Sequence, residues 1–117
     1  MEITSKRAYE PPGRDDGTRI LVDRLWPRGI KKEDARIDFW PRDLAPSNEL
    51  RKWYQHDYEK WETFKERYWK ELGAQPFELM TELKDYVKSG KVTFVFGSKE
   101  ENLNNARALK EYLEANG

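Results

Sequence analysis

The sequence predicts an α/β fold: a single small domain over residues 1–117, with a short, mainly parallel sheet of about three strands flanked by about five helices. Two observations support this fold class. Strand-like runs lie near both ends of the chain, and the long middle part has helical periodicity. An order of two strands, several helices, one strand and a final helix is typical of domains in which a helical crossover joins parallel strands.

Three segments have the character of strands. Residues 3–7 alternate weakly between apolar and polar, and residues 19–25 contain the apolar run Ile20-Leu21-Val22. Turn-forming residues at positions 11–17 separate these two strands. The third strand, residues 92–96, is the strongest because it consists of β-branched and aromatic residues. We expect residues 19–24 and 92–97 to be adjacent parallel strands at the centre of the sheet, with helices on both faces.

Helices are predicted at residues 31–35 and in four segments from Ser47 onward. Ser47 can cap a helix over residues 48–55, and Asp57 can cap the next, which ends at Gly73. Three apolar stripes follow amphipathic spacing: Tyr58, Trp61, Phe64, Tyr68 and Leu72; then Phe77, Met80, Leu83 and Val87; then Leu103, Ala106, Leu109 and Leu113. We expect these stripes to form the core, with Trp61 and Phe64 largely buried.

Composition excludes several classes of protein. Cysteine is absent, which excludes disulfide scaffolds, thiolate metal sites and cysteine nucleophiles. Basic and acidic residues each number 22, so the zero net charge argues against a nucleic-acid partner. No apolar run is long enough to span a membrane, and the N-terminus lacks a signal-peptide stretch. We therefore expect a cytoplasmic protein without a membrane partner, whose oligomeric state stays open.

The first candidate site follows the last strand, where Gly97-Ser98-Lys99-Glu100-Glu101 leads toward the last helix. Such a junction presents backbone N–H groups at the carboxyl edge of the sheet, and the Ser98 hydroxyl and Lys99 ammonium suit phosphate, sulfate or carboxylate. A capping box between Ser98 and Glu101 would instead use those N–H groups internally. Both interpretations stay open. No nucleotide-binding glycine fingerprint is present, so we expect no cofactor.

The second candidate site is the turn at residues 23–29, which follows the second strand. Its guanidinium groups, on Arg24 and Arg28, suit an oxyanion, and Asp23 adds a carboxylate. The structural alternative is that Asp23 pairs with an arginine while Pro27 and Gly29 only shape the turn.

His56, the only histidine, lies between two predicted helices. Its side chain titrates near neutral pH, which makes it a candidate general acid–base, although a helix cap or a surface residue explains it equally well. A single histidine without cysteine argues against a transition-metal site.

A series of motifs resembles a known family. They are Leu21-Val22-Asp23-Arg24-Leu25-Trp26-Pro27-Arg28-Gly29, Ala45-Pro46-Ser47, Glu49-Leu50-Arg51-Lys52-Trp53-Tyr54, His56-Asp57, Trp61 with Phe64, Arg67-Tyr68, Asn104-Asn105-Ala106 and Leu109-Lys110-Glu111-Tyr112-Leu113. Over nearly the whole chain they resemble the YeaO-like group of domain-of-unknown-function family 488, which implies a small stand-alone cytoplasmic α/β domain. Other branches of that family carry cysteine in the loop after the last strand, which suggests a rhodanese- or phosphatase-like anion cradle. Here that loop holds Lys99 and Glu100 without cysteine, so a thiol mechanism is excluded.

Together these features predict a site for a small phosphorylated or carboxylated metabolite at the carboxyl edge of the sheet. The candidate binding residues are Arg24, Arg28, Ser98, Lys99 and Asn105, and the candidate catalytic residues, if the protein is an enzyme, are His56 and Asp23. The alternative is a non-catalytic module that holds nucleic acid or a protein partner through residues 24–28 and exposed aromatics. Convergence of these residues on one pocket would favour the small-anion site.

Overall fold

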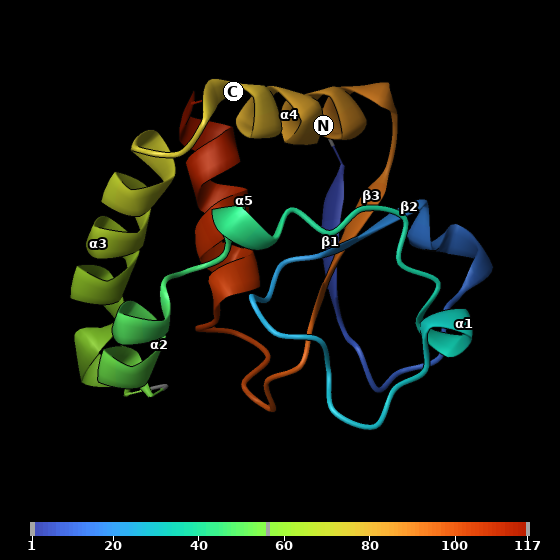
Figure 1. Ribbon diagram of the computed structural model, residues 1–117, viewed down its shortest axis with the longest axis horizontal. Helices are drawn as coiled ribbons and strands as arrows, with labels where there is room; N and C mark the ends of the chain where they lie inside the picture. The colour runs from blue at the N-terminus through green and yellow to red at the C-terminus, as the bar shows by residue number, and fades with distance from the viewer. Residues whose placement is uncertain (1, 56, 117) are drawn as a thin grey trace.

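The computed structural model describes residues 2–55 and 57–116, and within these ranges it contains three β-strands and five α-helices (Figure 1). In chain order the elements are β1 (Ile3–Arg7), the 3-10 helix η1 (Arg14–Asp16), β2 (Thr18–Leu21), α1 (Lys32–Ala35), η2 (Arg42–Leu44), α2 (Asn48–Tyr54), η3 (Tyr58–Lys60), α3 (Trp61–Gly73), α4 (Phe77–Ser89), β3 (Val92–Phe96) and α5 (Asn105–Asn116). The predicted α/β fold class is confirmed. None of the described helices is long and apolar enough to cross a membrane.

The sheet is parallel throughout and has the strand order β1-β3-β2. Val92 at the start of β3 pairs with Ile3 of β1 and Thr18 of β2, and every residue of β3 is buried. The predicted parallel pairing of the second strand with the last is confirmed. The prediction that both are central is wrong for β2, because the described chain supplies only three strands and leaves β2 at an edge. A single bridge to Phe39 covers part of that edge.

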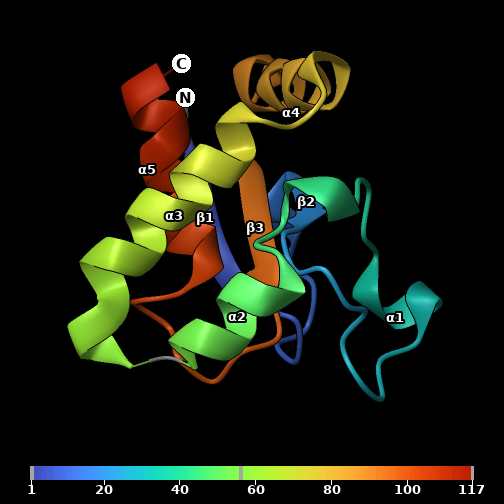
Figure 2. The same cartoon turned by 60° about the vertical axis from the view of Figure 1, so that its left-hand side comes forward.

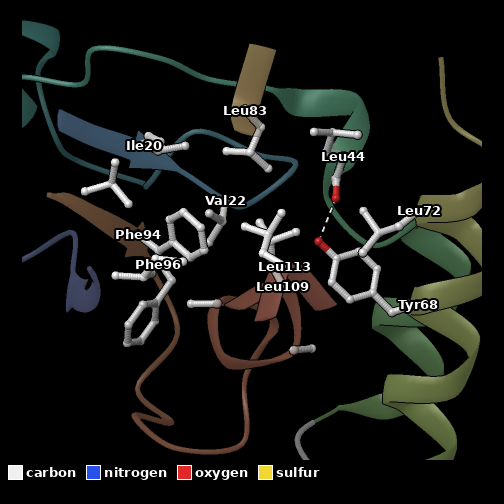
Figure 3. Packing of buried hydrophobic residues seen from close by; sticks show 14 of the residues in the cluster. Ile20, Val22, Leu44, Tyr68, Leu72, Leu83, Phe94, Phe96, Leu109 and Leu113 are labelled. Carbon is white, nitrogen blue, oxygen red and sulfur yellow. Dashed lines mark hydrogen bonds between the residues drawn. The ribbon is translucent and has the colours of Figure 1, made fainter. Parts of the chain in front are cut away.

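The two faces of the sheet are covered differently. On one face, residues such as Phe94 belong to the large core that the sheet forms with α2 to α5 (Figure 3). In Figure 1, helices α2, α3 and α5 lie to one side of the strands, and α4 lies across the end of the strands. The opposite face, with Leu21 and Val95, is covered by aromatic and aliphatic side chains from the irregular segment around α1, among them Trp26 and Trp40. The expectation of helices on both faces therefore holds for only one face, because α1 is four residues long.

A buried arginine organises the polar end of this second face. The side chain of Arg19 is 5% exposed; its Nη1 donates to Asp16 at 2.6 Å and its Nε to the carbonyl of Ala35 at 2.9 Å. Asp16 also accepts hydrogen bonds from Lys6 of β1 and from the backbone N–H of Gly13. These contacts join β1, η1, β2 and α1 around one carboxylate.

The aromatic stripe of α3 lies in the main core. Trp61 is 7% and Phe64 2% exposed, so their predicted burial is confirmed. Tyr68 is fully buried and donates its hydroxyl proton to the carbonyl of Leu44 at 2.6 Å, as Figure 3 shows. This hydrogen bond ties α3 to η2, the segment just before α2.

Two predicted stripe positions are exposed. Asp57 caps the 3-10 turn η3 instead of the α-helix, which begins at Trp61, so Tyr58 turns outward and is 61% exposed. Phe77, at the first position of α4, is 80% exposed because the neighbouring elements pack beyond the first turn, around Leu83.

We predict that Trp61→Ala lowers the free energy of unfolding by about 3–5 kcal/mol, because it leaves a large cavity in the core. Phe77→Ala, at the exposed stripe position, is the matched control and should change stability by no more than about 0.5 kcal/mol. Urea unfolding followed by circular dichroism measures both variants. Equal effects of the two substitutions would contradict the packing described above.

A second prediction concerns acid stability. Burial works against ionisation of Asp16, but hydrogen bonds from Gly13, Lys6 and Arg19 outweigh it and hold the pKa of this carboxyl below its ordinary value of 3.8. The stability that ionised Asp16 contributes is therefore present above about pH 4 and is lost as the pH falls through the lowered pKa of the folded state. Between pH 6 and pH 3, unfolding free energies should fall more steeply for the wild type than for Asp16→Asn. Parallel curves would contradict this assignment.

Candidate functional site

A cavity of about 210 Å³ lies where the segments after β2 and β3 meet α2, α3 and the start of α5. Figure 2 shows α2 and the segment after β3 at the same end of the domain. The cavity is lined by Asp23, Arg24, Leu25, Pro46, Arg51, Tyr54, Phe64, Ser98 and Asn105. It therefore lies at the carboxyl edge of the sheet, where ligands of parallel α/β domains commonly bind.

Asp23 ties the strand ends to the last helix. One carboxylate oxygen accepts the N–H of Gly97 at 2.7 Å, and the other accepts the side-chain amide of Asn105 at 2.9 Å. The same amide nitrogen of Asn105 donates to the carbonyl of Val22 at 2.8 Å. A Cβ on residue 97 would lie only 3.3 Å from the Asp23 carboxylate, so glycine permits the close approach. Asp23 thus has a structural role in the wall of the cavity.

Arg24, the next residue, is half-buried and rigidly held. Its Nε donates to the carbonyl of Pro46 and its Nη2 to the carbonyl of Ala45, each at 3.1 Å. Within residues 2–55 and 57–116 it forms no ion pair. A guanidinium carries five N–H donors, and two of them are used here, so Arg24 is a positioned cation with donors to spare.

Two polar lining residues, Arg51 and Tyr54, were not predicted as site residues. Arg51 is exposed on α2 and its Nη2 donates to the side chain of Asn48 at 3.2 Å. Tyr54 is buried one turn later and donates its hydroxyl to the carbonyl of Leu103 at 2.8 Å. Burial, and next the nearby carboxylate of Glu100, raises the pKa of Tyr54 to about 12, so its hydroxyl keeps its proton at neutral pH. Their three-residue spacing on a predicted helix indicates that Arg51 and Tyr54 share one helix face. The sequence does not indicate that this face lines a cavity, because that depends on how α2 packs.

The loop after β3 uses several of its own N–H groups. Ser98 Oγ accepts the N–H of Glu100 at 2.9 Å, and Glu100 Oε1 accepts the N–H groups of Asn102 and Leu103 at 2.9 and 3.0 Å. Helix α5 begins later than predicted, at Asn105, because the side chain of the buried Asn104 accepts the N–H of Arg107 and caps the helix there. The Ser98 turn is therefore separated from the first turn of α5, and Leu103 precedes the helix.

The structure brings together four of the seven candidate site residues: Asp23, Arg24, Ser98 and Asn105. Arg28 and Lys99 are exposed and lie outside the cavity lining, so the structure does not bring them together with Arg24 at this cavity. His56 lies outside the described residues.

The position of Arg28 follows from the packing of its turn. The indole N–H of Trp26 donates to the carbonyl of Ile30 at 2.7 Å, and Trp26 packs edge-on against Trp40 on the second face of the sheet. The carbonyl of Arg28 then accepts the hydroxyl of Tyr9 at 3.0 Å. The turn is thus held against Tyr9, just after β1, and Arg28 does not line the cavity.

These features define a small α/β domain with an arginine-lined cavity at the carboxyl edge of a parallel sheet. Comparison with known proteins places the chain more narrowly: it belongs to the YeaO-like DUF488 family. The family model described as "Inactive DUF488-N3 subclade" matches residues 2–116.

Relatives match along almost the whole chain. An uncharacterized protein of Escherichia coli K12, YeaO, is 42% identical over 115 residues, which cover 98% of this chain and 99% of the relative. An uncharacterized protein of Mycobacterium bovis is 40% identical over 107 residues, 92% of this chain and 89% of the relative. No solved structure gives a significant match.

We predict that Asp23→Asn and Asn105→Asp each lower the free energy of unfolding by about 1.5–3 kcal/mol. The first variant places an amide opposite the Asn105 amide, and the second places a carboxylate opposite the Asp23 carboxylate. The double variant should recover part of this loss, since it restores one amide and one carboxylate in exchanged positions. A double-mutant cycle by urea unfolding measures the coupling. Strictly additive losses would show that this hydrogen bond does not organise the strand ends.

Proposed function

We propose that the chain is a non-catalytic binding domain for a small anion, phosphate or carboxylate, held in the cavity at the carboxyl edge of the sheet. The observation that carries the proposal is the state of Arg24. Two backbone carbonyls orient its guanidinium at the cavity wall, and no acidic side chain of the described residues forms an ion pair with it. A guanidinium fixed in this way suits recognition of an oxyanion.

Charges around the cavity support an anionic ligand. Arg24 and Arg51 contribute two positive charges to the lining, and Asp23 contributes one negative charge. Both oxygens of Asp23 already accept N–H bonds, from Gly97 and Asn105, which offsets part of its charge. Among the described lining residues the positive charge therefore exceeds the negative by one, which favours an anionic ligand.

Several features argue for binding without catalysis. The sequence contains no cysteine, and both carboxylate oxygens of Asp23 are engaged in hydrogen bonds that hold the fold. Ser98 Oγ is likewise engaged by the N–H of Glu100. The word "inactive" in the description of the matching family model agrees with a protein that binds rather than reacts.

A macromolecular partner is the second candidate, favoured by the exposed position of Arg28. Together with Tyr9, which is 49% exposed and bonds the carbonyl of Arg28, it forms an accessible surface away from the cavity. The balanced charge of the chain argues for a protein partner over nucleic acid at this surface.

Binding of phosphate and acetate tests the proposed function. At tenfold excess over its Kd, the bound anion should stabilise the wild type by about 1.4 kcal/mol, measured by thermal unfolding and calorimetry at constant ionic strength against chloride. Arg24→Gln should abolish this gain and Arg51→Gln should weaken it.

Arg28→Gln is the matched control, because it removes an exposed guanidinium outside the cavity, and it should leave binding unchanged. Arg24 also donates to two backbone carbonyls, so Arg24→Gln can destabilise the fold. If that variant does not fold, weaker anion binding by Arg51→Gln tests the proposal. Wild-type protein that binds neither anion, or binding lost only in the Arg28 variant, would overturn the proposal and favour the surface around Arg28.

A further inference from the structure

Among the described residues, the hydrogen-bond donors that line the cavity besides its arginines are largely engaged within the protein. The amide of Asn105 donates to Val22 and Asp23, and the hydroxyl of Tyr54 donates to Leu103. A phosphate group is commonly held by a series of backbone N–H groups. In this loop, however, the N–H groups of residues 97, 100, 102 and 103 are already bonded to side chains of the same region.

Arg24 has the geometry to receive a carboxylate. Its Nε and one Nη2 proton are taken by the carbonyls of Pro46 and Ala45. The second Nη2 proton and the two Nη1 protons remain. The Nη2 proton and one Nη1 proton form an end-on fork whose two parallel N–H bonds match the two oxygens of a carboxylate. One planar head group is therefore satisfied by one side chain.

The rest of the wall is largely hydrocarbon. Leu25, Pro46 and Phe64 line the cavity together with the ring of Tyr54. Leu25 is 57% exposed although it is a large apolar residue next to Arg24, which makes its surface available to a ligand. Apolar contact there would add affinity in proportion to the hydrocarbon covered.

The size of the cavity limits the ligand. Its 210 Å³ corresponds to about seven water molecules at the density of the liquid, and it is smaller than the pockets of about 300–1,000 Å³ that hold drug-sized molecules. A nucleotide is too large to be enclosed. Asp23 also lines this small space and offsets one of the two arginine charges, so the lining carries a net charge that a single carboxylate neutralises.

We infer that the cavity binds a small monocarboxylic acid with a compact apolar body, its carboxylate on Arg24 and its hydrocarbon against Leu25, Pro46 and Phe64. This inference rests on the proposed anion-binding function and names the class of ligand. It separates this class from inorganic phosphate, from phosphate esters and from dicarboxylic acids.

A homologous series of ligands tests the inference. Calorimetric titration of the full chain with acetate, propionate, butyrate and pentanoate should show affinity rising about fourfold with each methylene group. Pentanamide, which keeps the shape and lacks the charge, should bind at least about tenfold more weakly than pentanoate. Glutarate, a diacid with the same number of carbons, and inorganic phosphate should also bind more weakly than pentanoate.

Leu25→Ser isolates the apolar contact. Because Leu25 is exposed, the variant should fold, and it should lose most of the gain in affinity between acetate and pentanoate. Phe77→Ser, at an exposed apolar residue away from the cavity, is the matched control and should keep the full gain.

The outcomes separate the two levels of the proposal. If all the anions bind but affinity does not change from acetate to pentanoate, or if phosphate binds best, the ligand class is wrong while anion binding stands. If no anion binds, the proposed function fails as well. If pentanamide binds as tightly as pentanoate, the cavity is an apolar site and both statements are overturned.

Discussion

The carboxylate of Asp23 is the contact on which the carboxyl edge of this domain depends. It accepts one N–H from Gly97 after β3 and one from Asn105 at the start of α5, while its own backbone continues from β2. Hydrogen bonds to a charged acceptor are among the stronger ones in proteins. The segments after β2 and β3 and the start of α5, which are far apart in sequence, are thereby fixed relative to one another. Because Arg24 directly follows Asp23, its backbone is positioned by the same contacts.

The opposite wall is held by a second set of contacts. Arg24 reaches the carbonyls of Ala45 and Pro46, and the next residue, Ser47, caps α2 while its N–H and hydroxyl donate to Glu71 of α3. The segment that receives the guanidinium is therefore anchored to the helical layer. Preorganisation of this kind lowers the entropic cost of binding, because the donor groups do not have to be ordered when a ligand arrives.

Local patterns in the sequence were sufficient to predict the strands, most helix ends and the buried stripe of α3, because propensity, capping and periodicity act over a few residues. They were insufficient for Tyr58 and Phe77, whose exposure depends on where neighbouring elements stop. The same holds for the site. Asp23, Arg24 and Asn105 follow strand ends or begin a helix, were predicted as candidates and line the cavity. Arg28 does not line it, because its turn is held by the packing of Trp26 against Trp40, a contact between segments that no local pattern predicts.

The strand order has a consequence for biosynthesis. Thr4 of β1 bonds Thr93 of β3 across a sequence separation of 89 residues, and β2 also pairs only with β3 among the strands. On the ribosome, both N-terminal strands therefore emerge long before the central strand on which they assemble. Such non-local pairing slows folding, and strands whose edges stay unpaired until then are open to aggregation. The sheet therefore cannot be completed until β3, its central strand, has emerged from the ribosome.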